Sequence, residues 1–370
     1  MSTVFIHVGT PKTGTSAIQF FCNKNRKLLK SKGVSFPDLG FEFPGIGVNR
    51  NGHFMNRREK DADKKRLHDK EAEIVEKGLN KIQKQLEKYP KVVLSDEQFW
   101  NNKEMNTEKW GQYKEKFAEM GADLKIIVYL RRQDLLIQSY WAQQVKETMT
   151  MSFKQYIDSG KYTYFNVDYA KRLEEIAAAV GKENIIVRVY EKQQYYGGNI
   201  LSDFLNILGL EMTDEYAQAD RVINASLEGS CLEVKRLLNN SSVYKSKKNF
   251  LVPLLTQVQQ KKEGNTGYDK GKYFSSADQL AFMSNFEEGN RAVAKEYLNR
   301  EDGVLFKDEI VAGDHDEQAS TYASKELVLI LGEVIAKQQK IIEEKEAELD
   351  SYKKKEQNKL VSAIKKVVKK

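Results

Sequence analysis

A strand pattern, a glycine loop and a helix pattern follow one another at the start of the chain. Residues 4–8 form a mostly apolar run of the length of a buried strand. Gly9 and Gly14 come next with the G-x4-G spacing of a phosphate-binding loop, and apolar residues then recur at helical spacing as far as Leu29. Because the N–H groups at a helix N-terminus attract anions, this order predicts a phosphate site there. A tight turn that carries two glycines by chance is the alternative.

Strand and helix patterns keep alternating beyond this first unit. Further strands are expected at 91–95, 125–130 and 185–190, and helices at 74–86, 134–146 and 201–208. This alternation predicts an α/β fold, a doubly wound parallel sheet of the P-loop type flanked by helices, with ligands at the carboxyl ends of the strands. The remainder is mainly helical. We expect a P-loop domain over 1–310, a helical extension over 311–352 and a basic amphipathic tail over 353–370.

Composition excludes several classes of protein. The chain has 370 residues, of which 40% are hydrophobic and 31% charged, so it can bury a large core. Cys22 and Cys231 are far apart in sequence and form no CxxC motif, which suits a reducing compartment. No apolar run reaches the ~18 residues of a membrane span, and the first residues lack the basic start of a signal peptide. We therefore expect a cytoplasmic protein.

The net charge of +7 is concentrated at the C-terminus. Residues 353–370 contain eight lysines and one glutamate, so the rest of the chain is balanced, and no nucleic-acid partner is expected. The tail predicts either peripheral contact with an anionic inner-membrane surface or a solvated helix. Ile335, Ile342 and Leu349 are seven residues apart, which weakly favours a helix–helix partner.

The glycine loop departs from the form found in nucleotide triphosphatases. Those loops carry Lys and then Ser or Thr after the second glycine, whereas this chain has Thr15 and Ser16 there and its lysine, Lys12, inside the loop. The backbone can still hold one anionic group, but the lysine that reaches a β/γ-phosphate pair is displaced. A ligand with a 5′-phosphate and no phosphate chain is therefore expected.

This loop resembles the 5′-phosphosulfate loop of sulfotransferases, which use 3′-phosphoadenosine 5′-phosphosulfate (PAPS) as sulfuryl donor. The residues that carry the resemblance are Pro11, Lys12, Thr13, Gly14, Thr15 and Ser16. In that family an arginine at a later strand end and a serine eight positions on bind the 3′-phosphate. Arg131 and Ser139 fit this pattern here, with Arg132 as the next candidate. A surface ion pair is the alternative role for Arg131.

Other segments support the same resemblance. A G-x-x-G-x-x-K sequence at 264–270 is similar to the loop that closes over the 3′-phosphate, which implies roles for Gly267 and Lys270, although a chance match is the alternative. Over about residues 3–306 the chain also resembles bacterial sulfotransferases that modify surface polysaccharides. The supporting segments are 94–97, 129–134, 187–191 and 224–227.

The chemistry of sulfuryl transfer suggests roles for these residues. Negative charge builds on the leaving 5′-phosphate oxygen, and a cation held there stabilises it without a metal; Lys12 is the candidate. Thr13 to Ser16 would hold the 5′-phosphate through backbone and hydroxyl groups. No His/Cys/Asp group has the spacing of metal ligands, so no metal is expected.

An acceptor hydroxyl also needs a base. Of the four histidines, His7 lies in the first strand pattern, His68 in a charged helical run and His315 in an acidic segment. His53 lies in the irregular, glycine-rich segment 37–68 and is the first candidate for the base. Glu97, just past a strand end, is the rival, with a cap or an ion pair as its alternative role.

Together these features predict a PAPS-dependent sulfotransferase acting on a carbohydrate hydroxyl, such as that of a bacterial surface polysaccharide or its precursor. Trp100, Tyr140 and Trp141 would suit a sugar, although aromatic residues more often belong to the core. A P-loop kinase and a non-catalytic nucleotide-binding scaffold are the alternatives.

Overall fold

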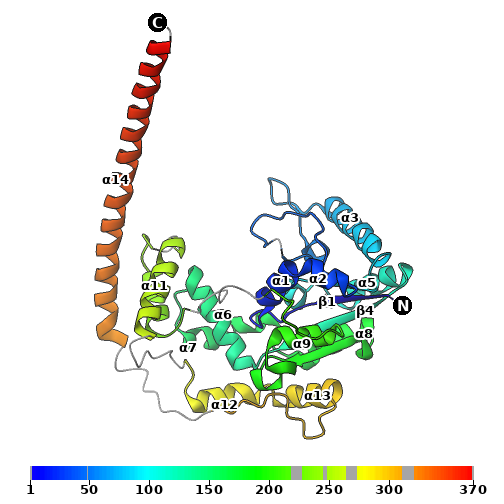
Figure 1. The fold of residues 1–370 in the computed structure, drawn as a ribbon. Coiled ribbons are helices and arrows are strands. Elements are labelled where there is room, and N and C mark those ends of the chain that lie inside the picture. Colours follow the sequence, from blue (N-terminus) through cyan, green and yellow to red (C-terminus); the bar gives the residue numbers. More distant parts are fainter. Residues whose placement is uncertain are drawn as a thin grey trace. The chain divides into compact units, whose positions relative to one another are not determined.

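The computed structural model divides into two compact units (Figure 1). The structure describes residues 2–47, 49–217, 227–244, 248–263, 273–310 and 321–368. Unit 1 comprises residues 1–140, 155–225 and 274–313. Unit 2 comprises residues 141–154, 226–273 and 314–370. Each unit is described below by itself.

Unit 1 is built on a five-stranded sheet in which every strand pair is parallel. Its strands are β1 (Ser2–His7), β2 (Val34–Ser35), β3 (Lys91–Ser95), β4 (Ala122–Leu130) and β5 (Ile185–Val189). They lie in the order β2-β3-β1-β4-β5. The α/β class, the parallel sheet and the flanking helices predicted from the sequence are confirmed, and β2 is a strand that the sequence analysis does not predict.

Helices of unit 1 follow the strands in turn. They are α1 (Thr15–Lys24), α2 (Arg26–Ser31), α3 (His68–Leu86), α4 (Gln98–Asn101), α5 (Thr107–Glu119), α8 (Tyr169–Val180), α9 (Ile200–Ile207), α12 (Ser276–Ser284) and α13 (Glu287–Leu298). Short 3-10 turns are η1 (His53–Asn56), η2 (Lys161–Phe165), η3 (Lys182–Asn184), η4 (Lys192–Gln194) and η5 (Tyr196–Gly198). Two helices cross from one unit into the other, α6 (Gln133–Glu147) and α7 (Phe153–Asp158).

The core of unit 1 forms because alternate residues of a strand point to opposite faces of the sheet. On one face, buried side chains of β1, β3 and β4 pack against α1, α2 and α9. The residues of this cluster include Phe5, Val93, Ile127 and Tyr129 from the sheet and Ile18, Phe21, Phe204 and Leu205 from the helices. Outside this cluster α5 packs against β4 and against α8. The sequence analysis predicts neither α5 nor α8.

The helix expected after the glycine loop is interrupted at Asn25. Its side-chain amide donates to the Phe21 and Ala217 carbonyls, so α1 ends and α2 starts at a new angle. After α2 the Gly33 carbonyl accepts from the amide of Lys91, the first residue of β3. Together α1 and α2 therefore carry the chain from the carboxyl edge of the sheet back to its amino edge.

Unit 2 contains α10 (Gly229–Leu238), α11 (Lys248–Glu263) and α14 (Thr321–Val368). A cluster of Leu238, Tyr244 and Leu251 packs against apolar side chains in the first third of α14, Ile335 among them. Tyr244 also donates a hydrogen bond to the Gly332 carbonyl. Ile342 and Leu349, the other two members of the seven-residue spacing, are exposed. Among the described residues, no helix combines the length and the apolarity that crossing a bilayer requires.

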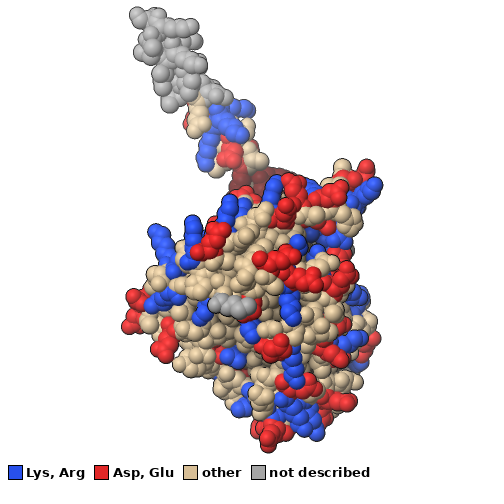
Figure 2. Space-filling model, turned by 90° about the vertical axis from the view of Figure 1, so that its right-hand side faces the viewer, with Lys and Arg blue, Asp and Glu red and all other residues tan. Residues whose placement is uncertain are grey.

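Charge is mixed on the surface. Figure 2 shows Lys and Arg interspersed with Asp and Glu over one face of the molecule. This mixture agrees with the balanced charge of the chain outside residues 353–370.

Candidate active site

The strand order reverses between β1 and β4, whose carboxyl ends lie side by side in the sheet. From β1 the chain passes through α1 and α2 to β2 on one side, whereas from β4 it passes to β5 on the other. In doubly wound sheets ligands bind at such a point of reversal. The glycine loop follows β1 and Arg131 follows β4, so the structure brings these two predicted elements together.

The glycine loop is fastened to β4 and turns on residues with a left-handed backbone. Tyr129 donates its amide to the Gly9 carbonyl at 2.7 Å, and the Thr10 amide donates to the Tyr129 carbonyl at 2.9 Å. Gly14 precedes α1 with φ 73°, a left-handed conformation that strains any residue with a side chain, and a Cβ there would displace the Ile200 methyl at 2.9 Å. Lys12 also has a positive φ, 66°, which is unusual for a residue with a side chain.

Two hydroxyl groups of the loop are used to shape it. Thr13 and Thr15 are buried, and both donate to the Thr10 carbonyl. Ser16 is exposed. No side chain caps α1, and the first turn of a helix leaves its N–H groups without intrahelical acceptors. Besides the Lys12 ammonium, backbone N–H groups and the Ser16 hydroxyl are therefore the donors that this loop offers to an anion.

Arg131 is a largely buried cation beside the loop. Its guanidinium donates to the Lys12 carbonyl at 2.9 Å and lies 5.5 Å from the centre of the Tyr190 ring. Burial lowers the pKa of Arg131, because the charged form loses water. Within the described part of the chain, no carboxylate forms an ion pair with it. A mostly buried cation without a carboxylate in direct contact is a candidate to bind an anion.

The neighbouring Arg132, by contrast, is committed to the fold. Its guanidinium donates to both carboxylate oxygens of Asp134, at 2.8 and 3.0 Å, and to the Asp308 carbonyl at 2.5 Å. Of the two arginines, Arg131 is therefore the one available for a ligand. Ser139 lies on the following helix, α6, and is partly exposed.

His53 belongs to a buried charged group at the end of β3. Its Nδ1 lies 2.7 Å from Asp96 Oδ2, and Arg50 pairs with the other carboxylate oxygen. Burial by itself would raise the pKa of Asp96, but the His53 hydrogen bond and the charges of Arg50 and His53 outweigh it and hold that pKa below its usual value. Such a carboxylate fixes the orientation of the imidazole.

Glu97 lies closer to the glycine loop. A Cβ built on Gly9 would lie 3.4 Å from the Glu97 Cβ. Burial raises the pKa of Glu97, and the negative charge of Asp96 adds to this, while the positive charges of Arg50 and Lys12 oppose it. A carboxylate with a raised pKa beside the loop lysine is the arrangement expected of a general base.

His7 and two tryptophans belong to the core, and His68 is exposed. His7 is enclosed between the Tyr129 and Phe204 rings, its Nδ1 lies 3.0 Å from Ser95 Oγ, and burial lowers its pKa to about 3. His68 lies on the surface. Both tryptophans that were considered for a sugar, Trp100 and Trp141, are buried and donate their indole N–H to backbone carbonyls.

Tyr140, the third aromatic residue considered for a sugar, lies near Glu97. Its ring stacks on Phe165, its hydroxyl accepts from Asn101 at 2.9 Å, and the charge of Glu97 contributes to its raised pKa after burial. Gly267, Lys270, His315 and residues 224–226 lie outside the described residues. Among the residues that the structure describes, no group of three or more His, Cys, Asp or Glu could hold a metal ion.

The sequence analysis missed three residues of the site. Asp96 and Arg50 surround His53, and Tyr190 lies against Arg131. Asp96 stands between Ser95 and Glu97, so its position at a strand end was a usable signal. Arg50 carries no local signal, because it reaches Asp96 through the irregular segment whose Asn51 donates to the Val93 carbonyl and accepts the Ser95 amide.

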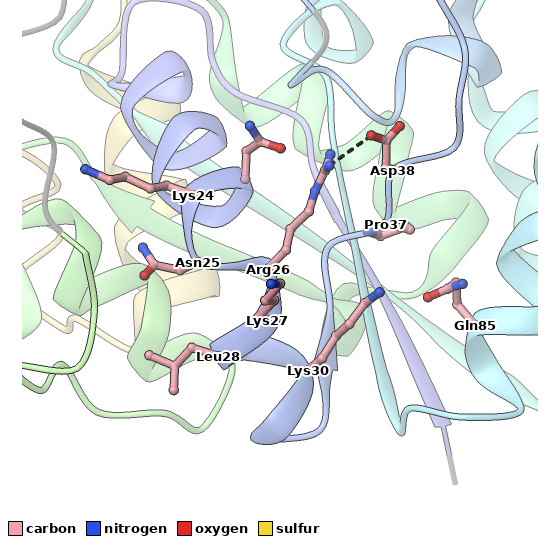
Figure 3. A pocket seen from close by; sticks show the side chains of 10 residues that line it. Lys24, Asn25, Arg26, Lys27, Leu28, Lys30, Pro37, Asp38 and Gln85 are labelled. Atoms are coloured by element: carbon pink, nitrogen blue, oxygen red, sulfur yellow. Dashed lines mark hydrogen bonds and ion pairs between the residues drawn. The ribbon is translucent and has the colours of Figure 1, made fainter.

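A separate pocket of about 730 Å³ lies at the far end of α1. It is lined by the end of α1, by α2, by Pro37 and Asp38, and by Gln85 of α3 (Figure 3). Four cations line it, namely Lys24, Arg26, Lys27 and Lys30. This pocket contains none of the residues predicted for the phosphate site.

The chain was compared with family models and with curated proteins. No family model matches the chain. An uncharacterized protein of Archaeoglobus fulgidus is 28% identical over 185 residues, which is 50% of this chain and 49% of that protein. The chain therefore spans about half the length of the curated relative that it matches.

Two solved structures resemble the fold. A sulfotransferase from Alicyclobacillus acidocaldarius has 15% identity and a TM-score of 0.36, over 70% of this chain and 96% of its own. The sulfotransferase domain from the curacin biosynthetic pathway has 14% identity and a TM-score of 0.36, over 77% of this chain and 98% of its own. These TM-scores are too low to establish a common family.

Proposed function

We propose that this protein is a sulfotransferase that moves a sulfuryl group from PAPS to a hydroxyl of a carbohydrate. The observation that carries the proposal is Arg131, a largely buried guanidinium with no carboxylate paired to it among the described residues, next to a glycine loop at the point where the sheet reverses. The glycine loop and Arg131 are two separate groups of donors for anions at this point of the sheet. Together they suit a nucleotide with phosphates at both its 5′ and 3′ positions.

The hydrogen-bonding groups and charges of these residues suit PAPS. N–H groups of the loop and of the first turn of α1, with the Ser16 hydroxyl, would hold the 5′-phosphate. Arg131, with Ser139 from α6, would hold the 3′-phosphate, since a guanidinium offers several donors in one plane. Thr13 and Thr15 would act through their amides, because their hydroxyls already donate to Thr10.

Transfer needs one cation and one base. As the acceptor oxygen bonds to sulfur, the bond from sulfur to the 5′-phosphate oxygen breaks and leaves its electron pair on that oxygen. Lys12 would stabilise the resulting negative charge. Glu97 would take the proton of the acceptor hydroxyl, because it lies beside the loop and its pKa is raised. His53, paired with Asp96, would then keep this end of β3 in place.

The carbohydrate acceptor is proposed from the segment that follows β2. Residues 36–47 and 49–52, which follow β2, form no helix or strand. Gly52 and Asn51 fix this segment to the end of β3, so it lies at the carboxyl edge near Glu97. Its glycines and polar side chains suit a polyhydroxylated ligand. From the resemblance to bacterial polysaccharide sulfotransferases we also propose a bacterial polysaccharide or its precursor as the acceptor. We propose the cytoplasm as the site of reaction.

Nucleotide selectivity tests the proposal. The melting temperature of the full chain would be measured with adenosine 3′,5′-bisphosphate, ATP, ADP and AMP, because a ligand of the folded state must raise it. We expect the bisphosphate to stabilise most, the Arg131→Ala variant to lose most of that shift, and the Arg291→Ala variant, which removes an exposed arginine of α13, to keep it. A preference for ATP with magnesium would favour a kinase, and no response to any nucleotide would contradict the proposal.

A further inference from the structure

We propose that the pocket at the end of α1 is a second anion site, which binds an acidic oligosaccharide segment through carboxylate or sulfate groups. Its volume of about 730 Å³ is within the range of ligand pockets, roughly 300–1,000 Å³. It lies ten helical residues from the glycine loop, and a helix rises 1.5 Å per residue, so the two sites are ~15 Å apart along α1. The sulfuryl-transfer residues therefore take no part in it.

Cations of the pocket come from one short stretch of chain. Lys24, Arg26, Lys27 and Lys30 lie within seven consecutive residues, and Asp38 is the one acid among the lining residues. The chain is balanced in charge outside its tail, so this local excess of positive charge is a specific feature of the pocket. A concave site lined by charges of one sign concentrates ligands of the opposite sign.

The side chains are arranged to share one ligand. Figure 3 shows Arg26 and Lys30 extending from α2 to the same side, with Asp38 and Gln85 across from them, while Lys24 extends away. Gln85 accepts from the Ser35 hydroxyl at 2.8 Å through Oε1, which leaves its amide nitrogen as a donor. Arg26 pairs with the exposed Asp38 at 3.0 Å, a contact that a carboxylate or sulfate on a ligand can replace.

The lining suits an acidic oligosaccharide. Its cations can pair with carboxylate or sulfate groups, and the amides of Asn23 and Gln85 can form hydrogen bonds with sugar hydroxyls. The identity of the ligand as a glycan rests on the proposed function. If the acceptor is a long acidic chain, binding one part of it here raises its effective concentration at the sulfuryl site.

Calorimetry at low salt tests this inference on the full chain. The probes are a chondroitin sulfate hexasaccharide, an unsulfated chondroitin hexasaccharide, maltohexaose and a thymidine decanucleotide. Lys27→Ala/Lys30→Ala removes two pocket lysines, and Lys114→Ala/Lys171→Ala removes two exposed lysines of α5 and α8 as the matched control. The basic tail is intact in both, so it contributes equally to both.

We expect the pocket variant to bind the acidic hexasaccharides about tenfold more weakly than the control variant, because charge-assisted hydrogen bonds are lost. Loss for both hexasaccharides assigns carboxylate binding, and loss for the sulfated one alone assigns sulfate binding. Equal affinity of the two variants, equal loss for the decanucleotide, or binding of maltohexaose that depends on the pocket overturns the inference. A bisphosphate thermal shift on the same samples reports the proposed function separately and shows that the variants are folded.

Discussion

Two groups of cations lie at opposite ends of α1, and they differ chiefly in pairing, because Arg131 and Arg26 are both only partly exposed but Arg26 has a carboxylate partner. At the start of α1, Arg131 is largely buried, its pKa is lowered by burial, and among the described residues no carboxylate forms an ion pair with it. At the end of α1, Arg26 pairs with Asp38, and Lys24 and Lys27 are exposed to water. A cation in water needs no partner, whereas a buried one does.

The difference indicates what each region requires. Burying a charge without a counter-charge costs stability, and such a cost is typical of a site that acts on a ligand. Exposed cations cost nothing to keep, so they give weaker evidence of a ligand and need a direct binding test. The region at the start of α1 therefore supports the proposed reaction, and the region at its end supports the further inference only.

The largest expected effect is on turnover at the start of α1. Glu97→Gln keeps the shape of the side chain but removes the base, and we expect turnover to fall by roughly 10²–10⁴-fold while adenosine 3′,5′-bisphosphate still stabilises the protein. The measurement is radiolabelled sulfuryl transfer to the acceptor that the wild-type chain modifies. Arg291→Ala, which removes an exposed arginine of α13, should leave turnover within about twofold.

His53→Ala separates the two candidate bases in the same assay. If Glu97 is the base, His53→Ala lowers turnover less than Glu97→Gln does, since it disturbs only the Asp96 pair. A larger loss for His53→Ala than for Glu97→Gln would give the role of base to His53.

A second effect concerns stability without ligand. Arg131→Met removes a buried charge and keeps the apolar volume, so we expect the free energy of unfolding to stay the same or rise by about 1 kcal/mol, even though nucleotide stabilisation is lost. Urea unfolding of the two proteins measures this difference. A fall of several kcal/mol would mean that Arg131 holds the loop in place structurally, through the Lys12 carbonyl, and the contrast with Arg26 would disappear.

A third effect is the pH dependence of stability. The folded-state pKa of Glu97 is raised above its ordinary value of 4.5. Between pH 4.5 and the raised pKa of Glu97, the folded protein binds more protons than the unfolded chain. The contribution of Glu97 to stability is therefore present below pH 4.5 and is lost as pH rises through the folded-state pKa. Urea unfolding across this range should show a weaker loss in Glu97→Gln. An identical slope in both proteins would contradict the raised pKa.

The sequence was sufficient to predict the parts of this site that follow strand ends. Gly9 and Arg131 each come directly after an apolar run, and in a parallel sheet such positions meet at one edge. Strand β2 was missed because two residues are too few to show an alternating pattern. Helices α1 and α2 were predicted as one helix because the break at Asn25 depends on a contact with the distant Ala217 carbonyl.

Roles that depend on pairing were beyond the sequence. The spacing to Ser139 favours Arg131 over the adjacent Arg132, but the sequence does not show that Arg132 is held by Asp134 and the Asp308 carbonyl. In the same way His53 resembles a free loop histidine until its Asp96 partner is known. Trp100 and Trp141 are sugar candidates by residue type, but their burial makes them core.

The smallest expected effect lies at the end of α1, in the Arg26–Asp38 pair. Its side chains are 23% and 69% exposed, so the ion pair is screened by water and should contribute less than about 1 kcal/mol. A double-mutant cycle with Arg26→Ala and Asp38→Ala, measured by urea unfolding at low and high salt, gives the coupling energy directly. We expect a small value that high salt reduces further. A coupling energy of several kcal/mol, insensitive to salt, would show that this pair is effectively buried, and the two ends of α1 would then no longer differ in kind.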